Sequence, residues 1–286
     1  MKIKVLKSYA KVNLFLKVGK KIKKNKLHNI QSLTFLLNIF DKIIFKKSKS
    51  FKDRVKFTGE FDKKIHIKNN SIIKSLSLLR KRSFINKNKF FDIIVKKNIP
   101  TFAGLGGGSS NAATVIKYFT KNKNISKEDI NFFSEVLGSD LRLFLGKNNI
   151  FQKSLFKISE FKLNYKFYFV LVFPYLSSST KLIYSKVKKF DIINNQKKIG
   201  KKSKNEFIQS LKSEKNSLEN IVTHKYPVIR KVLRELELQK NCCFSRVTGS
   251  GSACFGLFLS KRDATLARNK IKRRFPKFWC ILCTTI

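Results

Sequence analysis

Four glycines and three small polar side chains stand together within residues 100–113, in front of a helical pattern. The stretch reads Pro100-Thr-Phe-Ala-Gly-Leu-Gly-Gly-Gly-Ser-Ser-Asn-Ala-Ala113. Glycine permits positive φ and close approach of the backbone, so successive N–H groups can converge on phosphate oxygens. Apolar residues at Val115, Ile116 and Phe119 continue into a helix, whose N-terminus favours an anion. The pattern therefore predicts a phosphate-binding loop.

Two familiar glycine motifs do not fit this loop. A Walker-type loop needs a lysine to reach the β- and γ-phosphates, and no lysine lies between Gly104 and Asn111. A dinucleotide-binding fingerprint needs a third glycine where this chain has Ser109, and the acidic Glu128 begins a helical pattern rather than ending a strand. A flexible turn between a strand and a helix is the alternative that remains.

The composition is that of a folded protein with an unusual charge. The 286 residues allow one large domain or two ordinary ones, and 42% are hydrophobic, including 28 Phe. The formal net charge is +46, but 52 Lys stand against 11 Arg, and they are spread along the whole chain. A protein that reads bases or phosphates through bidentate contacts would be expected to use more arginine. We interpret the charge as a solvated lysine coat and do not expect nucleic acid as a partner.

Neither a secretion signal nor a membrane partner is expected. Residues 1–18 alternate polar and apolar side chains, and the longest apolar run, 167–173, is far shorter than a bilayer requires. All five cysteines lie in the last 45 residues, without a second zinc-type pair or a nearby His. The apolar alternation around Cys280 and Cys283 favours buried, reduced thiols on a strand. We therefore expect a cytoplasmic protein.

Hydrophobic periodicity outlines the elements that must position the loop. Alternation over residues 2–18, broken near Ser8 and Tyr9, predicts two strands, and residues 55–67 resemble a hairpin around Gly59. Asn70 and Ser126 are suitable N-caps, each ahead of a helical pattern. Elsewhere we expect an apolar segment at 33–45, strands at 90–96 and 167–173, a mobile polar loop at 191–205, a helix at 226–238 and a second glycine element at 247–253.

Three motifs together resemble a known kinase superfamily. They are the glycine loop, the Gly-Ser-Gly-Ser element at 249–252 and the stretch Ala-Lys-Val-Asn-Leu-Phe-Leu at 10–16. Taken in their order along the chain, they resemble the galactokinase, homoserine kinase, mevalonate kinase and phosphomevalonate kinase (GHMP kinase) superfamily, and the resemblance covers most of the chain. The resemblance implies an α+β, two-domain GHMP-kinase fold. It has a ribosomal-protein-S5-like ATP-binding domain at 1–155 and a ferredoxin-like domain at 156–286, with the ATP site between them.

One branch of the superfamily is especially similar, and it implies the reaction. That branch uses ATP and Mg²⁺ to phosphorylate the 2-hydroxyl on the methylerythritol part of a cytidine diphosphate conjugate, in the non-mevalonate isoprenoid pathway. Phosphoryl transfer needs positioning, a carboxylate beside the attacking hydroxyl and a cation that keeps this carboxylate ionised. By resemblance the carboxylate is Asp140 and the cation is Lys11. Standing alone, an aspartate after Gly138 would indicate an Asx turn or a helix cap.

The same resemblance implies binding residues. A cytosine ring needs a stacking surface and hydrogen bonds to its polar edge, and His28 and Tyr184 match these roles. Lys97 and Asn70 match positions near the nucleotide base, and the alternative for both is exposed surface. The alternative for His28 is a structural role, and the alternative for residues 249–252 is a tight turn between strands. The residues expected at ATP, with magnesium near Ser110 or Asn111, are Asn70, Lys97, Pro100, Thr101, Phe102, Ala103, Gly104, Leu105, Gly106, Gly107, Gly108, Ser109, Ser110 and Asn111. Those expected at the acceptor are Asn13, His28, Thr180, Tyr184, Gly249, Ser250 and Gly251, with 249–252 also bracing the loop or the transferred group.

Two positions depart from the pattern of that branch. Leu27 replaces a tyrosine that would stack on cytosine, so one wall of the base site is expected to be apolar, and Arg142 replaces a proline in the turn that aims Asp140. The alternatives left open are a superfamily kinase for homoserine or mevalonate, and a basic nucleic-acid-binding protein on an eroded kinase scaffold. A monomer or a weak homodimer that acts on a small molecule is expected.

Overall fold

A computed structural model describes residues 4–23, 26–63, 65, 70–146, 149–163, 166–194 and 203–286. The chain forms two compact units. The first contains residues 1–10, 39–101 and 106–147, and the second contains 11–38, 102–105 and 148–286. Strands β1 (Lys4–Lys21) and β2 (His28–Lys47) pair with each other and each runs from one unit into the other.

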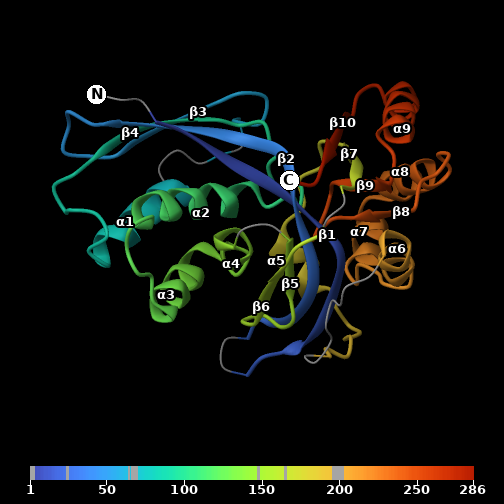
Figure 1. Ribbon diagram of the computed structural model, residues 1–286, viewed down its shortest axis with the longest axis horizontal. Coiled ribbons are helices and arrows are strands. Elements are labelled where there is room, and N and C mark those ends of the chain that lie inside the picture. Colours follow the sequence, from blue (N-terminus) through green and yellow to red (C-terminus); the bar gives the residue numbers. More distant parts are fainter. Residues whose placement is uncertain are drawn as a thin grey trace. The chain divides into compact units, whose positions relative to one another are not determined.

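In the first unit, strands are covered by helices. Strand β4 (Phe91–Lys96) pairs antiparallel with residues 42–47 of β2 and parallel with β3 (Arg54–Thr58). Helices α1 (Ser71–Lys81) and α2 (Gly107–Thr120) lie side by side along these strands (Figure 1), and α3 (Lys127–Leu137) and α4 (Leu141–Leu145) pack against them. Alternate apolar residues of β4 and the apolar faces of α1 and α2 are buried, which gives this unit its core.

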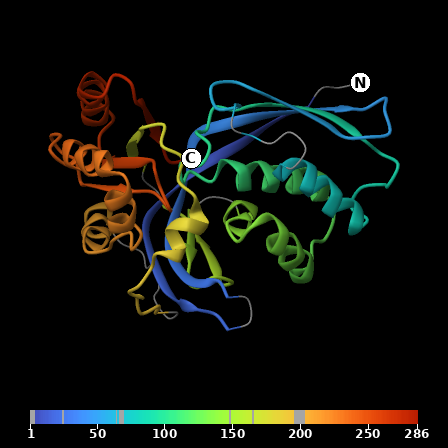
Figure 2. The ribbon, with the colours of Figure 1, turned by 180° about the vertical axis from the view of Figure 1, so that it is seen from behind.

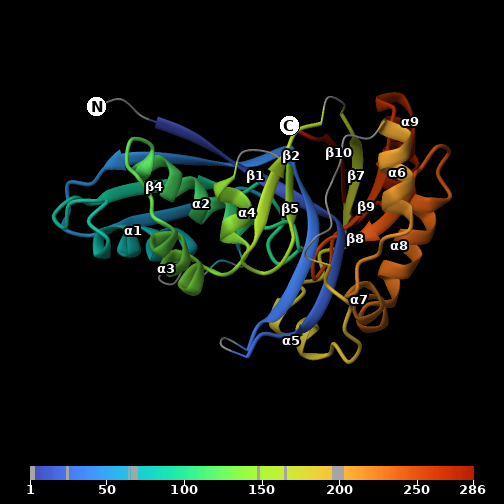
Figure 3. The same cartoon turned by 60° about the horizontal axis from the view of Figure 1, so that its bottom comes forward.

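In the second unit, four antiparallel strands form a sheet in the order β10-β7-β9-β8. The strands are β7 (Tyr168–Phe173), β8 (Phe244–Val247), β9 (Cys254–Phe258) and β10 (Trp279–Thr284). Helices α8 (Pro227–Glu237) and α9 (Lys261–Arg274) pack on one face of it (Figure 3). This strand–helix–strand–strand–helix–strand arrangement is the expected ferredoxin-like one. The unit also contains β5 (Asn149–Gln152), β6 (Ile158–Phe161), α5 (Thr180–Ser185), α6 (Lys204–Lys212) and α7 (Glu219–Lys225).

Both predicted N-caps are confirmed. The side-chain oxygen of Asn70 accepts hydrogen bonds from the backbone N–H groups of Ile72 and Ile73 at the start of α1. Ser126 caps α3, and Asp129 completes a reciprocal capping box. Each cap satisfies N–H groups that have no partner within the helix, so both signals are local and readable in the sequence.

Two strand predictions were wrong. Over the described residues 4–18 the chain forms one strand rather than two, because β1 continues through Ser8 and Tyr9 without interruption. Ser8 breaks the apolar alternation because its hydroxyl is buried and hydrogen-bonded, not because the strand ends there. No return strand follows Gly59 in the described residues 60–63 and 65, and β3 pairs in parallel with β4 instead. Residues 64, 66 and 67 of that predicted hairpin lie outside the described residues.

The remaining predictions concern the second unit. The helix at 226–238 is confirmed as α8, and Cys280 and Cys283 are buried on β10 as free thiols. The predicted loop 191–205 ends earlier, because Ser203 caps α6 and Lys204 is helical, while 195–202 lie outside the described residues. Throughout the described ranges, each helix is too short or too polar to cross a bilayer.

Candidate active site

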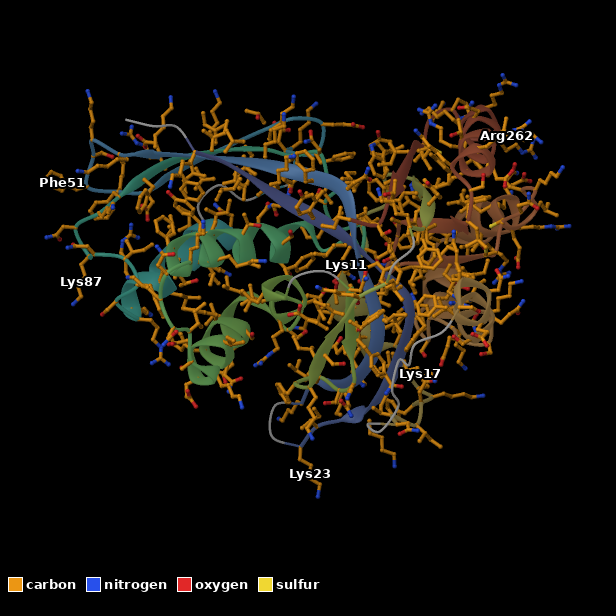
Figure 4. All side chains as sticks on the ribbon, viewed as in Figure 1. Lys11, Lys17, Lys23, Phe51, Lys87 and Arg262 are labelled. Carbon is orange, nitrogen blue, oxygen red and sulfur yellow. The ribbon has the colours of Figure 1, made fainter. Side chains whose placement is uncertain are left out.

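Lys11 lies on β1 with 3% of its surface exposed, and Asn13 holds it there. The Lys11 ammonium donates to the side-chain oxygen of Asn13. The Asn13 amide nitrogen donates to the hydroxyls of Ser32 (2.7 Å) and Thr34 (3.2 Å), which fixes the orientation of the amide. Figure 4 labels Lys11 over the strands near the middle of the view, whereas the labelled Lys23 and Lys87 extend outward. A buried ammonium needs such a partner, because an isolated buried charge is strongly unfavourable.

The second glycine element, between β8 and β9, lies against this lysine. Gly249 has φ +56°, and a Cβ added to it would come within 3.1 Å of the Lys11 Nζ atom and 3.3 Å of the Asn13 Oδ1 atom. The Asn13 N–H donates to the Thr248 hydroxyl at 3.1 Å. Asn216 donates from its side-chain nitrogen to the carbonyls of Val247 and Gly249, each at 2.8 Å. The N-terminal motif and this glycine element therefore meet around the Lys11 ammonium.

The first part of the phosphate loop, residues 102–105, is held by the same element. The Lys11 N–H donates to the Leu105 carbonyl (3.0 Å), and the Ala253 N–H donates to the Ala103 carbonyl (3.0 Å). Gly104 has φ +80°, and a Cβ there would lie 2.2 Å from the Thr248 carbonyl oxygen, so only glycine fits. Thr248 and Ala253, on either side of residues 249–252, thus contact this part of the loop, and the bracing role of 249–252 stays a prediction.

Helix α5 connects the glycine element to His28. Its first residue, Thr180, has its hydroxyl 2.9 Å from that of Ser250. One turn later, Tyr184 has its ring centroid 5.8 Å from the centroid of His28. Residues four apart on a helix share a face, so α5 brings both side chains to one side. Figure 2 shows α5 in yellow beside the blue strands β1 and β2.

His28 has a defined tautomer when it is neutral. Its Nδ1 atom is 3.0 Å from the Gly19 carbonyl oxygen, which can only accept, so Nδ1 carries the proton. The Nε2 atom is then a hydrogen-bond acceptor. His28 is 7% exposed. The structural alternative for His28 explains the Gly19 contact of Nδ1, and the part of His28 in base recognition stays a prediction.

Phe190 supplies an aromatic surface that sequence reasoning missed. Its ring centroid is 5.6 Å from that of His28, and 43% of its surface is exposed. Leu27 has the expected place next to His28 in the chain, but Phe190, following α5, is the second aromatic group at the histidine. With 28 Phe in the chain, nothing in the local sequence distinguishes this one. The expectation of an apolar wall is therefore incomplete, because an aromatic ring from elsewhere lies beside His28.

The second part of the phosphate loop belongs to the first unit and begins α2. The N-cap residue Gly106 has φ +72° and no side chain to satisfy the first N–H groups of the helix. A Cβ added to Gly108 would meet no atom within 4 Å, whereas one on Gly107 would come within 3.2 Å of Ile99. A helix N-terminus with an open glycine is a suitable place for an anion. The flexible-turn alternative does not explain why the glycines continue into the helix.

Lys97 and Asn70 are both buried, so the exposed-surface alternative was wrong for each. The Lys97 ammonium forms an ion pair with Asp41 and donates to the side-chain oxygen of Asn111 at 3.0 Å. Asp41 was missed in the sequence, where its signal was an aspartate inside the apolar segment 33–45. Asn111 and Ser110 are each 2% exposed, and both ends of the Asn111 amide are hydrogen-bonded. The Ser110 oxygen accepts one bond, from Ser8 (2.8 Å), and keeps a second lone pair, which makes it the magnesium candidate of the two.

Asp140 is half-buried at the N-cap position of α4, but its side chain makes no capping hydrogen bond. The helix-cap alternative therefore does not account for it. Arg142 does not disrupt this turn: its N–H donates to the Ser139 carbonyl (3.4 Å), a bond that proline could not form. Its guanidinium donates to Asn131 on α3 at 2.6 Å, which ties α4 to α3.

Sequence comparison places the chain among kinases. Residues 70–142 match the family described as "GHMP kinases N terminal domain", and residues 196–277 match "GHMP kinases C terminal". A protein of Pelagibacter ubique named 4-diphosphocytidyl-2-C-methyl-D-erythritol kinase is 38% identical, over 98% of each chain. A protein of the same name from Thermodesulfovibrio yellowstonii is 30% identical over 98% of this chain and 97% of its own.

Solved structures of related kinases share the fold. A 4-(cytidine 5'-diphospho)-2C-methyl-D-erythritol kinase superimposes with a TM-score of 0.72 at 23% identity, covering 99% of this chain and 100% of its own. The homoserine kinase of Cytophaga hutchinsonii gives a TM-score of 0.66 at 15% identity, covering 96% and 94%. At these identities the likeness establishes the architecture, whereas the choice of substrate depends on the residues described above.

Proposed function

The chain belongs to the 4-diphosphocytidyl-2-C-methyl-D-erythritol kinase family of the GHMP kinases, and we propose that it catalyses the reaction in that name. It transfers the γ-phosphoryl group of ATP to the 2-hydroxyl of the methylerythritol part of the cytidine diphosphate conjugate, a step in isoprenoid precursor synthesis. We place this reaction in the cytoplasm, where free thiols such as the five of this chain stay reduced.

One observation carries the choice of acceptor. Helix α5 holds Thr180 at Ser250 of the glycine element and Tyr184 at His28, so a phosphoryl-transfer motif and a base-recognition group are joined by a single short helix. Neutral His28 presents Nε2 as an acceptor, which complements the amino group on the polar edge of cytosine. Tyr184 and Phe190 offer aromatic surface on which the base can stack. Homoserine and mevalonate contain no base that would use these groups.

The chemistry assigned to the chain's own residues is simple. The Asp140 carboxylate accepts the proton of the acceptor hydroxyl. The oxygen of that hydroxyl attacks the γ-phosphorus of ATP, and the bond between the γ-phosphorus and the ADP oxygen breaks. The Lys11 ammonium, oriented by Asn13, offsets negative charge that develops on the transferred group. The N–H groups at Gly106–Ser110 and the N-terminus of α2 hold phosphate oxygens.

We propose that Mg²⁺ enters with ATP. The ion usually takes most of its ligands from substrate phosphates and water, and it neutralises charge on the β- and γ-oxygens. The parts of the chain that the structure describes hold no group of three or more His, Cys, Asp or Glu side chains arranged for a metal. The hydroxyl of Ser110 is the side-chain oxygen that we assign to this ion.

A coupled assay of ATP turnover tests the proposal with three acceptors: the cytidine diphosphate conjugate, homoserine and mevalonate. We expect turnover with the conjugate alone, and a loss of kcat of about 100-fold or more in Asp140→Asn and in Lys11→Met. Asp62→Asn, a change of the same kind outside the assigned site, serves as the matched control. Turnover with homoserine or mevalonate instead, or full activity in Asp140→Asn, would refute the assignment.

A further inference from the structure

Asp41 is a fully buried carboxylate that the proposed chemistry does not use. It lies on β2 within the first unit and is 0% exposed, and its ion-pair partner Lys97 is 2% exposed. A buried ion pair is a weak source of net stability, because the desolvation of both charges offsets their attraction. Stability alone is therefore a poor explanation for placing this pair in the core.

The hydrogen bonds of Asp41 reach the chain on both sides of the phosphate loop. Its Oδ1 atom accepts from the backbone N–H groups of Asn98 (2.8 Å) and Ile99 (2.9 Å), directly before Pro100. Its Oδ2 atom accepts from Lys97 and from the Asn111 side-chain nitrogen (3.0 Å), after the glycines. One carboxylate thus joins the entry to the loop and the first turns of α2.

A second set of bonds extends this connection to the loop itself. The Asn111 side-chain nitrogen also donates to the Ser8 hydroxyl of β1 (2.8 Å), and Ser8 donates to the Ser110 hydroxyl (2.8 Å). Ser8, Ser110 and Asn111 are all at most 2% exposed. Buried networks in which every member has a partner hold a single geometry, because each displacement leaves a polar group unsatisfied.

We propose that Asp41 is a positioning residue for the nucleotide: it fixes the two ends of the phosphate loop so that the N–H groups of residues 106–110 point at the phosphates before ATP arrives. This rests on the proposed function, since the ligand of the loop is taken to be ATP. Preorganisation of this kind lowers the ordering that binding would otherwise require. Lys97 then acts through Asp41 and Asn111 as a part of the same device.

The first test uses Asp41→Asn, which keeps the size of the side chain but removes the charge and one acceptor. We expect the KM and the Kd for ATP to rise about tenfold or more, while the KM for the alcohol acceptor stays within about twofold. Asp53→Asn is the matched control. Asp53 is a half-buried carboxylate of this unit whose side chain is 9% exposed. It is bonded to Arg80 (2.6 and 2.9 Å) and to the Phe91 N–H (2.9 Å), but these bonds do not reach the loop. The variant Asp53→Asn should lower the free energy of unfolding and leave the KM for ATP unchanged.

The second test is hydrogen exchange without nucleotide, at backbone amides 106–111, in the wild type, Asp41→Asn and Asp53→Asn. Faster exchange there in Asp41→Asn alone supports the proposal. Unchanged exchange, or an equal effect of Asp53→Asn, overturns it. Because this readout needs no ATP, it still tests the role of Asp41 if the wild type binds no ATP, a result that would count against the proposed function instead.

The third test separates positioning from folding. Asp41→Leu with Lys97→Met replaces the ion pair by apolar groups of similar size, so no unpaired charge stays buried, although the Asn98 and Ile99 N–H groups lose their acceptor. If this double variant melts as the wild type does but its loop amides exchange faster, the pair positions the loop. If it is stable and both its loop exchange and its Kd for ATP match the wild type, Asp41 has no positioning role.

Discussion

Single residues fix the geometry around Lys11, and the sharpest case is Gly249. Its φ of +56° already disfavours a side chain, and an added Cβ would lie 3.1 Å from the Lys11 Nζ atom and 3.2 Å from the Gly104 carbonyl oxygen. We expect Gly249→Ala to lower kcat about tenfold to 100-fold, because small displacements of a charge-stabilising group have large effects. It should also lower the free energy of unfolding by about 1 kcal/mol or more, as alanine does at positive φ.

Gly108→Ala is the informative counterpart to that change. A Cβ at Gly108 meets no protein atom within 4 Å, so the free energy of unfolding should not fall. If the space beside it receives phosphate, the KM for ATP should rise while the KM for the acceptor does not. Equal effects of both alanines on ATP binding and on kcat would contradict this division of roles. Steady-state kinetics and urea unfolding measure both.

The five thiols are predicted to be unreactive in the folded protein. Burial raises the pKa of every one, to about 12 for Cys242 and about 11 for Cys280, and the pKa values of Cys254 and Cys283 also lie well above the usual range. At pH 8 roughly one Cys280 side chain in a thousand would be a thiolate, the form that reacts. We expect slow labelling by a thiol reagent in buffer and fast labelling of all five in denaturant. Rapid labelling of Cys254, Cys280 or Cys283 in the native protein would contradict the burial of these three thiols.

The helix caps could be predicted from the sequence, whereas contacts between residues far apart in the chain could not. The caps at Asn70 and Ser126 depend on groups two or three residues away, so a short stretch of chain contains the whole interaction. The three sequence motifs likewise pointed to Lys11 and to the second glycine element. Other features depend on residues that lie far apart in the sequence. They are the continuation of β1 through Ser8, which bonds Ser110, the ion pair of Asp41 with Lys97, and the approach of Phe190 to His28. No window of sequence contains both partners of such a contact.

The segment after α5 is expected to control binding of the acceptor. Asp191 fastens it to β1: its N–H donates to the Val18 carbonyl (2.8 Å), and its carboxylate accepts from the Val18 N–H (2.8 Å) and from the Ser217 hydroxyl. Phe190 is the preceding residue. We expect Asp191→Ala to raise the KM for the cytidine diphosphate conjugate about fivefold to 20-fold, because Phe190 loses its fixed place beside His28.

A graded control accompanies that prediction. Ser217→Ala removes only one of the partners of the Asp191 carboxylate, so its effect on the KM for the conjugate should be smaller. Neither change should alter the KM for ATP. An Asp191→Ala enzyme with an unchanged KM for the conjugate, or with both KM values raised equally, would show that this segment does not serve base recognition.

The whole chain divides into two domains, and we propose that the boundary lies between residues 155 and 156. The two family matches, 70–142 and 196–277, fall on either side of this boundary. The compact units interleave along the chain, because β1 and β2 each contribute to both.

We also propose that the protein is a monomer or a weak homodimer. Sedimentation across a range of protein concentrations would test this.

The net charge of +46 predicts that added salt stabilises the folded protein but weakens the binding of its substrates. Lys23, Lys87 and Arg262 are exposed and extend outward (Figure 4), as a solvated coat should. Raising the ionic strength from about 0.01 M to about 0.1 M shortens the screening length from about 30 Å to about 10 Å. We expect the free energy of unfolding to rise because like charges repel less, and the KM for both anionic substrates to rise because attraction weakens.

Denaturant unfolding and kinetics in the same salt series test these two signs. A nucleic-acid-binding protein would behave differently, because it would bind random duplex tightly at physiological salt, with an affinity that falls steeply as salt increases. Such binding would overturn the interpretation of the lysines as a coat. Weak binding to duplex, together with stability that increases with salt, supports it, since the charge then affects the enzyme only through repulsion and weak attraction of its anionic substrates.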